Sequence, residues 1–276
     1  MRLIVGDTAH IARYFPDDVV KIPSRDIPGH LFDASYEEVH LVFGLNMKGL
    51  SPSAYDEVNH LYTLEVMEGF RRRSRRIVLY STCELWSDCW GPIDLATPFR
   101  FHDDPYILSK WRIVDRVRRM GLRNVVIIFP FNHNSIHRKA DFLFGKVFQS
   151  IATGTPVEIG DTHYYRDLLH SAYVAEVCQR LTGDTIIGSG RMVFVNDFIR
   201  DLYRRFNRRY EDLVRESAGK WNYIPKNEYY LRGGIRYPYE RLLADTVKDL
   251  QSLAPPGTSS EYIAPDGAPT PAEGTA

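Results

Sequence analysis

Short apolar runs alternate with longer amphipathic stretches along the first half of the chain. The runs are rich in β-branched residues, which is typical of strands buried on both faces of a parallel sheet. They predict strands near 2–5, 19–23, 39–43, 77–80 and 125–129.

Two stretches between these runs have the periodicity of helices. From Tyr55 to Phe70 apolar residues recur at three- and four-residue steps, and a similar stripe follows Pro105. Proline is accepted in the first turn of a helix, and Gly121 predicts the end of this one. Strands alternating with helices indicate an α/β fold, a Rossmann-like doubly wound parallel sheet with helices on both faces.

The pattern loosens after about residue 130. Helices are expected near 141–153, 171–181 and 196–206, and short strands near 157–159 and 192–195. They predict a smaller α/β lobe over the carboxyl edge of the sheet, where open α/β sheets bind ligands. We therefore expect a cofactor-binding core over 1–130, an interleaved substrate-binding lobe over 131–253, and a disordered tail over 254–276, which is poor in large apolar residues.

Composition and charge narrow the class of protein. The formal net charge of the 276 residues is zero, so no overall field attracts nucleic acid or acidic membranes. No apolar run reaches the roughly 18 residues of a membrane span, and no signal-peptide pattern is present. Three cysteines are too few for a disulfide framework and indicate a reducing, cytoplasmic location. The basic run 71–76 is expected to be a solvated helix end, with a phosphate-binding patch as the alternative.

Candidate chemistry gathers between residues 81 and 110. Tyr106 and Lys110 lie one helical turn apart on one face. An ammonium beside a phenol lowers the pKa of the phenol and makes it a usable base, although a simple surface pair is the alternative. Ser81, Thr82 and Glu84 follow the fourth strand, at the edge where sites in such sheets form. A strand-end turn with local hydrogen bonds is the alternative there.

The segment Ser-Thr-Cys-Glu-Leu-Trp (81–86), followed about two dozen residues later by Pro-Tyr-Ile-Leu-Ser-Lys, resembles the extended short-chain dehydrogenase/reductase family. The nearest pattern is that of GDP-mannose 4,6-dehydratase and related NAD(P)-dependent nucleotide-sugar dehydratases and epimerases. The resemblance implies that Thr82 orients the 4-hydroxyl of the sugar, and that Tyr106 removes its proton while hydride passes to the nicotinamide. It implies that Lys110 holds the tyrosine and the nicotinamide ribose, and that Glu84 is a base at C5.

One residue of this segment departs from the dTDP-glucose type of sugar dehydratase. Cys83 stands where those enzymes have an aspartic acid that protonates the leaving hydroxyl. This difference argues against dehydration of that kind.

Further resemblance lies in the second half of the chain. Residues 131–138 resemble an Asn-His-Glu-Ser-Pro-Arg segment that approaches nicotinamide and substrate, which implies substrate contacts from Asn132 and Arg138 as well as from Ser81. Arg166 belongs to a run whose arginine commonly meets the nucleotide diphosphate. Ordinary turn and capping chemistry is the alternative for each residue.

Assembly is also implied by the resemblance. Asn59 matches an asparagine in the helix that forms the family's four-helix bundle. The helices near 55–70 and 106–120 have wide apolar faces, so we expect a homodimer through such a bundle.

The phosphate-binding loop departs from the family. Three glycines are expected there, because they allow a tight turn and a close approach to the pyrophosphate. Only Gly6 is present, with Ala9 and Ala12 at the other two positions. The family pattern still implies cofactor contacts from Gly6, Ala9 and Ile11, as well as from Tyr106 and Lys110.

The adenosine side of the sheet is expected to be trimmed. About fifteen residues separate the second and third strands, which is too few for a full crossover and an additional strand. Arg25 follows the second strand, where NADP-using relatives have a basic residue for the 2′-phosphate. NADP is therefore slightly favoured over NAD.

Together these features predict an NAD(P)-dependent epimerase or dehydratase that acts on a nucleotide-linked sugar through transient C4 oxidation. An NADP-dependent ketoreductase is one alternative. The altered glycine loop favours another, a non-catalytic binding protein on the same scaffold. A metal enzyme using His102, Asp103 and Asp104 is the weakest reading, because these residues also form a simple charge cluster before a helix.

Overall fold

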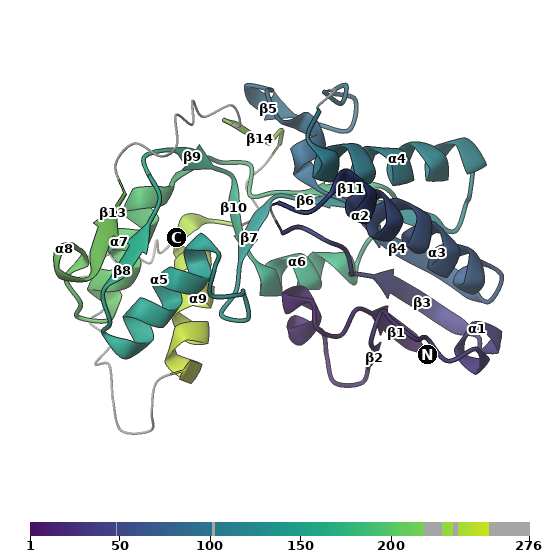
Figure 1. Ribbon diagram of the computed structural model, residues 1–276, viewed down its shortest axis with the longest axis horizontal. Helices are drawn as coiled ribbons and strands as arrows, with labels where there is room; N and C mark the ends of the chain where they lie inside the picture. The colour runs from purple at the N-terminus through teal and green to yellow at the C-terminus, as the bar shows by residue number, and fades with distance from the viewer. Residues whose placement is uncertain (48, 101–102, 218–227, 234–236, 254–276) are drawn as a thin grey trace, which may run out of the picture.

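Six parallel strands form one open sheet at the centre of the protein, seen in a computed structural model (Figure 1). The structure describes residues 1–47, 49–100, 103–217, 228–233 and 237–253. Across the sheet the strands follow the order β11-β6-β4-β3-β1-β2. Their bounds are Arg2–Val5 (β1), Val20–Ile22 (β2), Tyr36–Leu41 (β3), Ser74–Tyr80 (β4), Val125–Pro130 (β6) and Thr185–Ile187 (β11). This is the Rossmann-like α/β fold that the sequence predicts.

Two strands differ from the prediction. β3 begins at Tyr36, earlier than expected, because Glu38 and His40 interrupt the apolar run although both are buried. They hydrogen-bond to each other inside the protein, which offsets the cost of their burial. β11 was not predicted, since three residues are too short to stand out from the surrounding loop.

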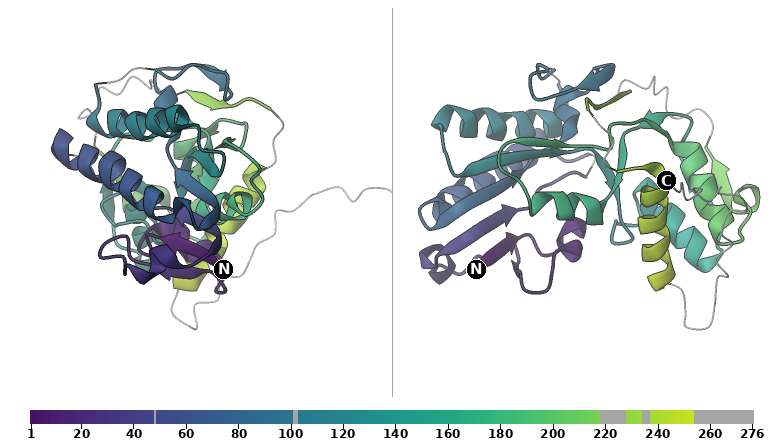
Figure 2. Two further views of the ribbon diagram at one scale, coloured as in Figure 1. Left: turned by 90° about the vertical axis from the view of Figure 1, so that its right-hand side faces the viewer. Right: turned by 180° about the vertical axis from the view of Figure 1, so that it is seen from behind.

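Helices cover both faces of the sheet (Figures 1 and 2). One face carries a continuous helical stretch of α2 (Pro52–Asp56), the π-helical η2 (Glu57–Tyr62) and α3 (Thr63–Arg71), next to α4 (Pro105–Met120). The other face carries the 3₁₀ helix η1 (His10–Tyr14) and α6 (Ser171–Cys178). The predicted helix end is confirmed, because Gly121 adopts the left-handed conformation at the C-cap of α4.

The predicted trimming of the adenosine side is confirmed. β2 is the edge strand of the sheet, and only the one-turn helix α1 (His30–Asp33) lies between it and β3. The only helix in the connection from β1 to β2 (residues 6–19) is the five-residue η1, where a full Rossmann unit has a long helix.

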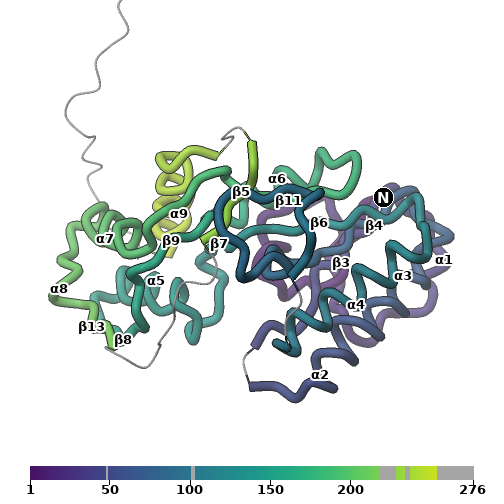
Figure 3. Tube along the Cα trace, turned by 90° about the horizontal axis from the view of Figure 1, so that it is seen from above, coloured from purple at the N-terminus to yellow at the C-terminus, as the bar shows by residue number. Residues whose placement is uncertain are grey.

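A second group of elements lies beside the carboxyl edge of the sheet (Figures 1 and 3). It contains α5 (Leu143–Thr153), α7 (Val195–Arg205), α8 (Tyr210–Leu213), α9 (Tyr239–Leu253) and the strand pairs β8 (Val157–Ile159) with β13 (Val214–Glu216) and β9 (Tyr165–Arg166) with β12 (Val193–Phe194). Two further pairs are β7 (Asn132–Asn134) with β10 (Leu168–His170) and β5 (Gly91–Ile93) with β14 (Tyr229–Leu231). The predicted tail, 254–276, is outside the described residues, and the division into core and lobe stays a prediction. Within the described ranges, no helix combines the length and apolarity of a membrane crossing.

Candidate active site

The candidate site begins where β4 ends. The backbone N–H of Ser81 donates to Ile128 at 2.8 Å, and Thr82 then caps the short helix η3 (Cys83–Trp86) by accepting from the Glu84 N–H at 3.2 Å. The Ser81 hydroxyl is buried and lacks a hydrogen-bond partner among the described residues. Such an unpaired buried hydroxyl is a site that a ligand can satisfy.

Tyr106 approaches this strand end from the first turn of α4. Asp104 caps the helix by accepting from the Tyr106 N–H at 2.8 Å, and the Tyr106 phenol lies close enough to the Thr82 hydroxyl for Thr82 to affect its pKa. Burial raises the pKa of the Tyr106 phenol, while the Thr82 hydroxyl and the charge of Arg138 partly counteract it. A bound ligand is therefore needed before the phenol becomes an effective base.

Lys110, one helical turn after Tyr106 in α4, is hydrogen-bonded to the end of β4. Its Nζ donates to the carbonyl of Tyr80 at 3.2 Å, and burial lowers the pKa of Lys110 from 10.5 to about 8. The sequence predicts that the Lys110 ammonium lowers the pKa of the Tyr106 phenol; burial is the largest influence on that pKa and shifts it upward.

Asn59 and Gly44 lie close to the Lys110 ammonium. The fully buried Asn59 accepts from Leu45 N at 2.7 Å and donates to Leu45 O at 2.9 Å and to Ser109 Oγ at 3.1 Å. A Cβ on Gly44 would lie 2.9 Å from Asn59 Oδ1 and 3.1 Å from Lys110 Nζ, at a φ of +153°. The sequence reading missed Gly44, whose position directly after a strand was the available signal.

Glu84 and Cys83 lie in the same turn and differ in what they can do. Glu84 is partly buried and accepts from Ser87 Oγ at 2.7 Å, and its charge helps to raise the pKa of Tyr106. Cys83 is fully buried, and burial raises the pKa of its thiol well above the ordinary value. The thiol is therefore a poor proton donor to a leaving hydroxyl.

A pair of histidines links the glycine loop to β7. The rings of His10 and His133 stack with centroids 4.7 Å apart, and each Nδ1 lies near Ser171 Oγ, at 3.1 and 2.8 Å. Because the Ser171 hydroxyl donates to Asn134 O at 2.8 Å, it accepts from both rings. Burial, with the charge of Arg138, lowers the pKa of His10 to about 3, and the pKa of His133 is also lowered, so both rings are neutral. His10 was missed because its role depends on contacts far along the chain.

A cavity of about 160 Å³ opens beside this pair. Asn132, Arg138 and Arg166 line it together with the aromatic side chains of Phe142, Phe144 and Tyr164. The Arg138 guanidinium lies 4.9 Å from the Phe142 ring centre and that of Arg166 lies 4.5 Å from the Tyr164 ring centre. Three of the four predicted substrate-binding residues therefore share one cavity, and the fourth, Ser81, is not among its lining residues.

In the glycine loop, three backbone N–H groups that could bind a pyrophosphate already donate to acceptors within the protein. Gly6 has a φ of +110°, and a Cβ there would lie 3.0 Å from Phe43 N, so the backbone requires glycine. The N–H groups of Gly6 and Asp7 both donate to Ile22 O, at 2.9 and 3.1 Å, and that of Ala9 donates to Gly6 O at 3.0 Å. These donors are consumed within the protein, and a five-residue 3₁₀ helix follows them.

The predicted cofactor contacts thus fit unevenly. Thr82, Tyr106 and Lys110 are the residues that would hold the nicotinamide end of a dinucleotide, and the buried, unpaired Ser81 hydroxyl lies one position before Thr82. The pyrophosphate fits less well, and Arg25 is an exposed side chain beyond β2.

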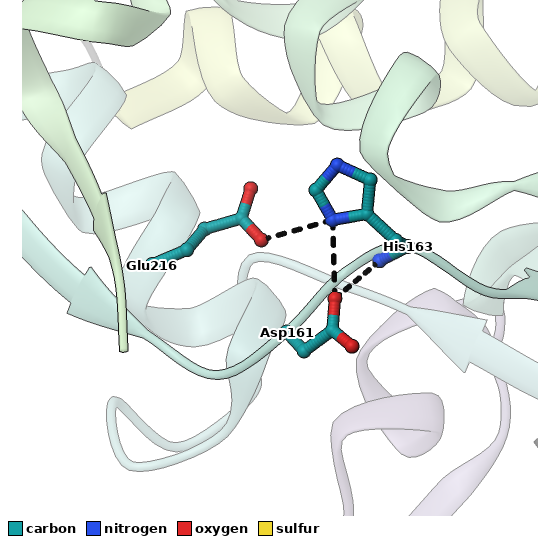
Figure 4. A group of neighbouring side chains, drawn as sticks. All are labelled: Asp161, His163 and Glu216. Carbon is teal, nitrogen blue, oxygen red and sulfur yellow. Dashed lines mark hydrogen bonds and ion pairs between the residues drawn. The ribbon is translucent and has the colours of Figure 1, made fainter. Parts of the chain in front are cut away.

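One cluster in the lobe has metal-ligand types (Figure 4). His163 Nδ1 lies 3.1 Å from Asp161 Oδ1 and 3.3 Å from Glu216 Oε2. Glu216 already accepts hydrogen bonds from Thr162, Asn196 and Tyr210, so this is a hydrogen-bonded charge cluster. In the alternative trio, His102 is outside the described residues and Asp104 is the cap of α4.

Solved structures of other proteins resemble the fold of this chain. No protein-family model and no curated protein matches the sequence. Among solved structures, RMD from Pseudomonas aeruginosa complexed with NADPH has a TM-score of 0.71 at 18% identity, covering 91% of this chain and 99% of that one. A UDP-N-acetylglucosamine 4-epimerase from Methanobrevibacter ruminantium has a TM-score of 0.73 at 14% identity over 91% and 99%. A UDP-glucuronic acid 4-epimerase from Bacillus cereus in complex with NAD has a TM-score of 0.70 at 12% identity over 92% and 97%. At these identities the likeness establishes the Rossmann-like fold.

Proposed function

We propose that this chain is an NAD(P)-dependent enzyme of the extended short-chain dehydrogenase type that epimerises or dehydrates a nucleotide-linked sugar. The observation that carries the proposal is the convergence of Thr82, Tyr106 and Lys110 at the carboxyl end of β4. Similar folds in complex with NADPH, with NAD and with nucleotide sugars support it.

The steps follow from what each side chain can reach. Thr82 orients the 4-hydroxyl of the sugar toward Tyr106, and the phenolate of Tyr106 takes its proton. Bound nicotinamide supplies the acceptor and later the donor of the C4 hydride. Lys110 stabilises the negative charge that develops on the phenol, because its ammonium is desolvated and held in place by the Tyr80 carbonyl.

The carboxylate of Glu84 acts at C5. Once C4 is a carbonyl, the proton on C5 becomes acidic. Glu84 removes it from the adjacent turn and, as the neutral acid, returns a proton to C5 before the hydride returns to C4. The buried thiol of Cys83 replaces the acid that would protonate a leaving hydroxyl, so epimerisation is favoured over dehydration.

The cavity holds the nucleotide half of the substrate. Arg166 binds the diphosphate, Asn132 binds the sugar, and the aromatic rings pack against the base. Ser81 binds the reacting end through its unpaired hydroxyl. Gly6, Ala9 and Ile11 line the dinucleotide, and Arg25 favours NADP.

The proposal also includes a homodimeric assembly and a cytoplasmic location. We place a homodimer interface on the four-helix bundle of α2–α3 and α4, where Leu61 is 54% exposed. Three free, buried cysteines suit a reducing cytoplasm.

A non-catalytic binding protein on this scaffold is the second candidate. The observation that favours it is the glycine loop, whose Gly6, Asp7 and Ala9 N–H groups are consumed internally. It differs from the enzyme in predicting no bound nicotinamide.

The test begins with protein purified without added cofactor. Mass spectrometry of the released ligands is expected to find NADP or NAD, and turnover of UDP- and GDP-sugars is expected to disappear in Tyr106→Phe. Because the phenol is needed for proton removal and not for holding the diphosphate, binding should remain within a few fold. Tyr36→Phe, the same change at the amino end of β3, is the matched control and should retain turnover. Equal turnover in both variants would refute the enzymatic role of Tyr106.

A further inference from the structure

Tyr229 is a buried residue that reaches the candidate active site from a distant part of the chain. The residue is 2% exposed, and its hydroxyl donates to the carbonyl oxygen of Cys83 at 2.9 Å. Tyr229 begins β14, which pairs in parallel with β5 beside the site (Figure 1). The roles proposed above for Thr82 and Glu84 make no use of this phenol.

Contacts outside the turn 82–84 hold the Tyr229 side chain in place. The ring of Tyr229 packs against that of Phe131, with centroids 5.4 Å apart. Two residues further along β14, the N–H of Leu231 donates at 3.1 Å to Asp167, whose carboxylate is fully buried. The phenol therefore approaches Cys83 from a strand that is fixed by pairing, by packing and by a buried hydrogen bond.

The Cys83 carbonyl belongs to the peptide unit that joins Cys83 to Glu84. A peptide unit is planar, so its C=O and its N–H turn together. The C=O accepts from Tyr229, while the N–H of Glu84 in the same plane donates to Thr82 Oγ1 at 3.2 Å. The Tyr229 phenol thus holds in place the N–H that binds the Thr82 hydroxyl.

This arrangement determines where the Thr82 hydroxyl can donate. A threonine hydroxyl has one proton and two lone pairs, and the Glu84 N–H occupies one lone pair. The proton must therefore point away from that N–H. In the proposed reaction it donates to O4 of the sugar, whose own proton then faces Tyr106. A displacement of about 1 Å at such a contact can lower a rate by about a hundredfold.

We propose that Tyr229 is a positioning residue, which orients the Thr82 hydroxyl for C4 oxidation through the peptide unit between Cys83 and Glu84. This inference rests on the proposed function. Tyr229 is not among the residues that line the nucleotide cavity, so its loss affects the rate of the reaction and not the binding of the substrate.

The first experiment compares two neighbouring tyrosines. Tyr229→Phe removes the hydroxyl and keeps the ring beside Phe131, so the variant is expected to fold, which thermal unfolding checks. Turnover of UDP-glucose, UDP-glucuronate and GDP-mannose is measured on the nicotinamide-loaded protein. We expect Tyr229→Phe to lower kcat at least about tenfold and to leave KM within about twofold. The matched control Tyr230→Phe should change neither.

A double-mutant cycle separates positioning from a general structural effect. Thr82→Val removes the hydroxyl that Tyr229 orients. In single-turnover measurements of C4 hydride transfer, Tyr229→Phe should slow the native chain at least about tenfold but the Thr82→Val variant less than about twofold, because both changes affect one contact.

The outcomes separate the inference from the proposed function. Equal losses in the two backgrounds, or an unchanged kcat in Tyr229→Phe, would overturn the role of Tyr229 while the proposed function stands. If the native chain turns over none of the three sugars, the proposed function fails and the inference fails with it.

Discussion

Replacing Lys110 by methionine is expected to stabilise the protein while removing its activity. Lys110 is 7% exposed, and burial lowers its pKa from 10.5 to about 8. At about 1.4 kcal/mol for each pKa unit, keeping the buried ammonium charged at pH 7 costs about 3 kcal/mol. The lost hydrogen bond to the Tyr80 carbonyl offsets about 1.5 kcal/mol of that gain. Lys110→Met should therefore unfold with a free energy about 1–2 kcal/mol higher than the native chain.

The pH dependence has a definite sign. Below pH 8 the lysine is protonated in both states, so the full penalty is present. Between pH 8 and 10.5 the folded state loses its proton first, so the unfolded state binds more protons and stability rises with pH. The native chain should gain about 2 kcal/mol from this group between pH 7 and 9.5, and the advantage of Lys110→Met should disappear.

Urea unfolding at pH 7 and 9.5, on protein freed of nucleotide, measures both quantities. The exposed Lys248→Met is the control and should change little at either pH. The reasoning is refuted if Lys110→Met is less stable than the native chain at pH 7 by an amount that does not change with pH.

Three further predictions concern activity and stability. Turnover should fall as pH rises through about 8, because neutral Lys110 no longer stabilises the phenolate. A turnover rate that stays the same up to pH 9.5 would contradict this. Gly44→Ala should lower the free energy of unfolding by about 1–3 kcal/mol and also lower turnover, since its methyl meets Asn59 at a positive φ; Gly29→Ala, with open space around it, should show neither effect in the same urea titration. Glu84→Gln should stop exchange of the C5 proton with heavy water while C4 oxidation continues, and undiminished exchange would exclude Glu84 as the base.

The fold was largely predictable because buried parallel strands have continuous apolar runs. Prediction was weakest where polar residues are buried, as at Glu38 and His40 in β3, whose mutual hydrogen bond has no local sequence signal. It was weak again at β11, which is held by pairing with β6 and by Asp184 accepting from Ile127 N at 2.8 Å. Both features depend on contacts between segments far apart in the chain.

The positions of the candidate residues in the fold were more predictable than their electrostatics. Spacing placed Tyr106 and Lys110 on one helix face, but it gave no information on burial, which dominates the pKa of each group. The stacked His10 and His133 lie 123 positions apart in the sequence, and Ser171 joins them from a third element. A single sequence holds no signal for such a three-way contact.

Transfer of the C4 hydrogen tests the central claim most directly. UDP-glucuronate and UDP-glucose labelled with deuterium at C4 are mixed with the nicotinamide-loaded protein, the reaction is stopped during turnover, and the released cofactor is weighed by mass spectrometry. The account predicts deuterium in the reduced cofactor from the native chain and none from Tyr106→Phe. Product that forms without any label reaching the cofactor, or the absence of reaction with every nucleotide sugar, would contradict it.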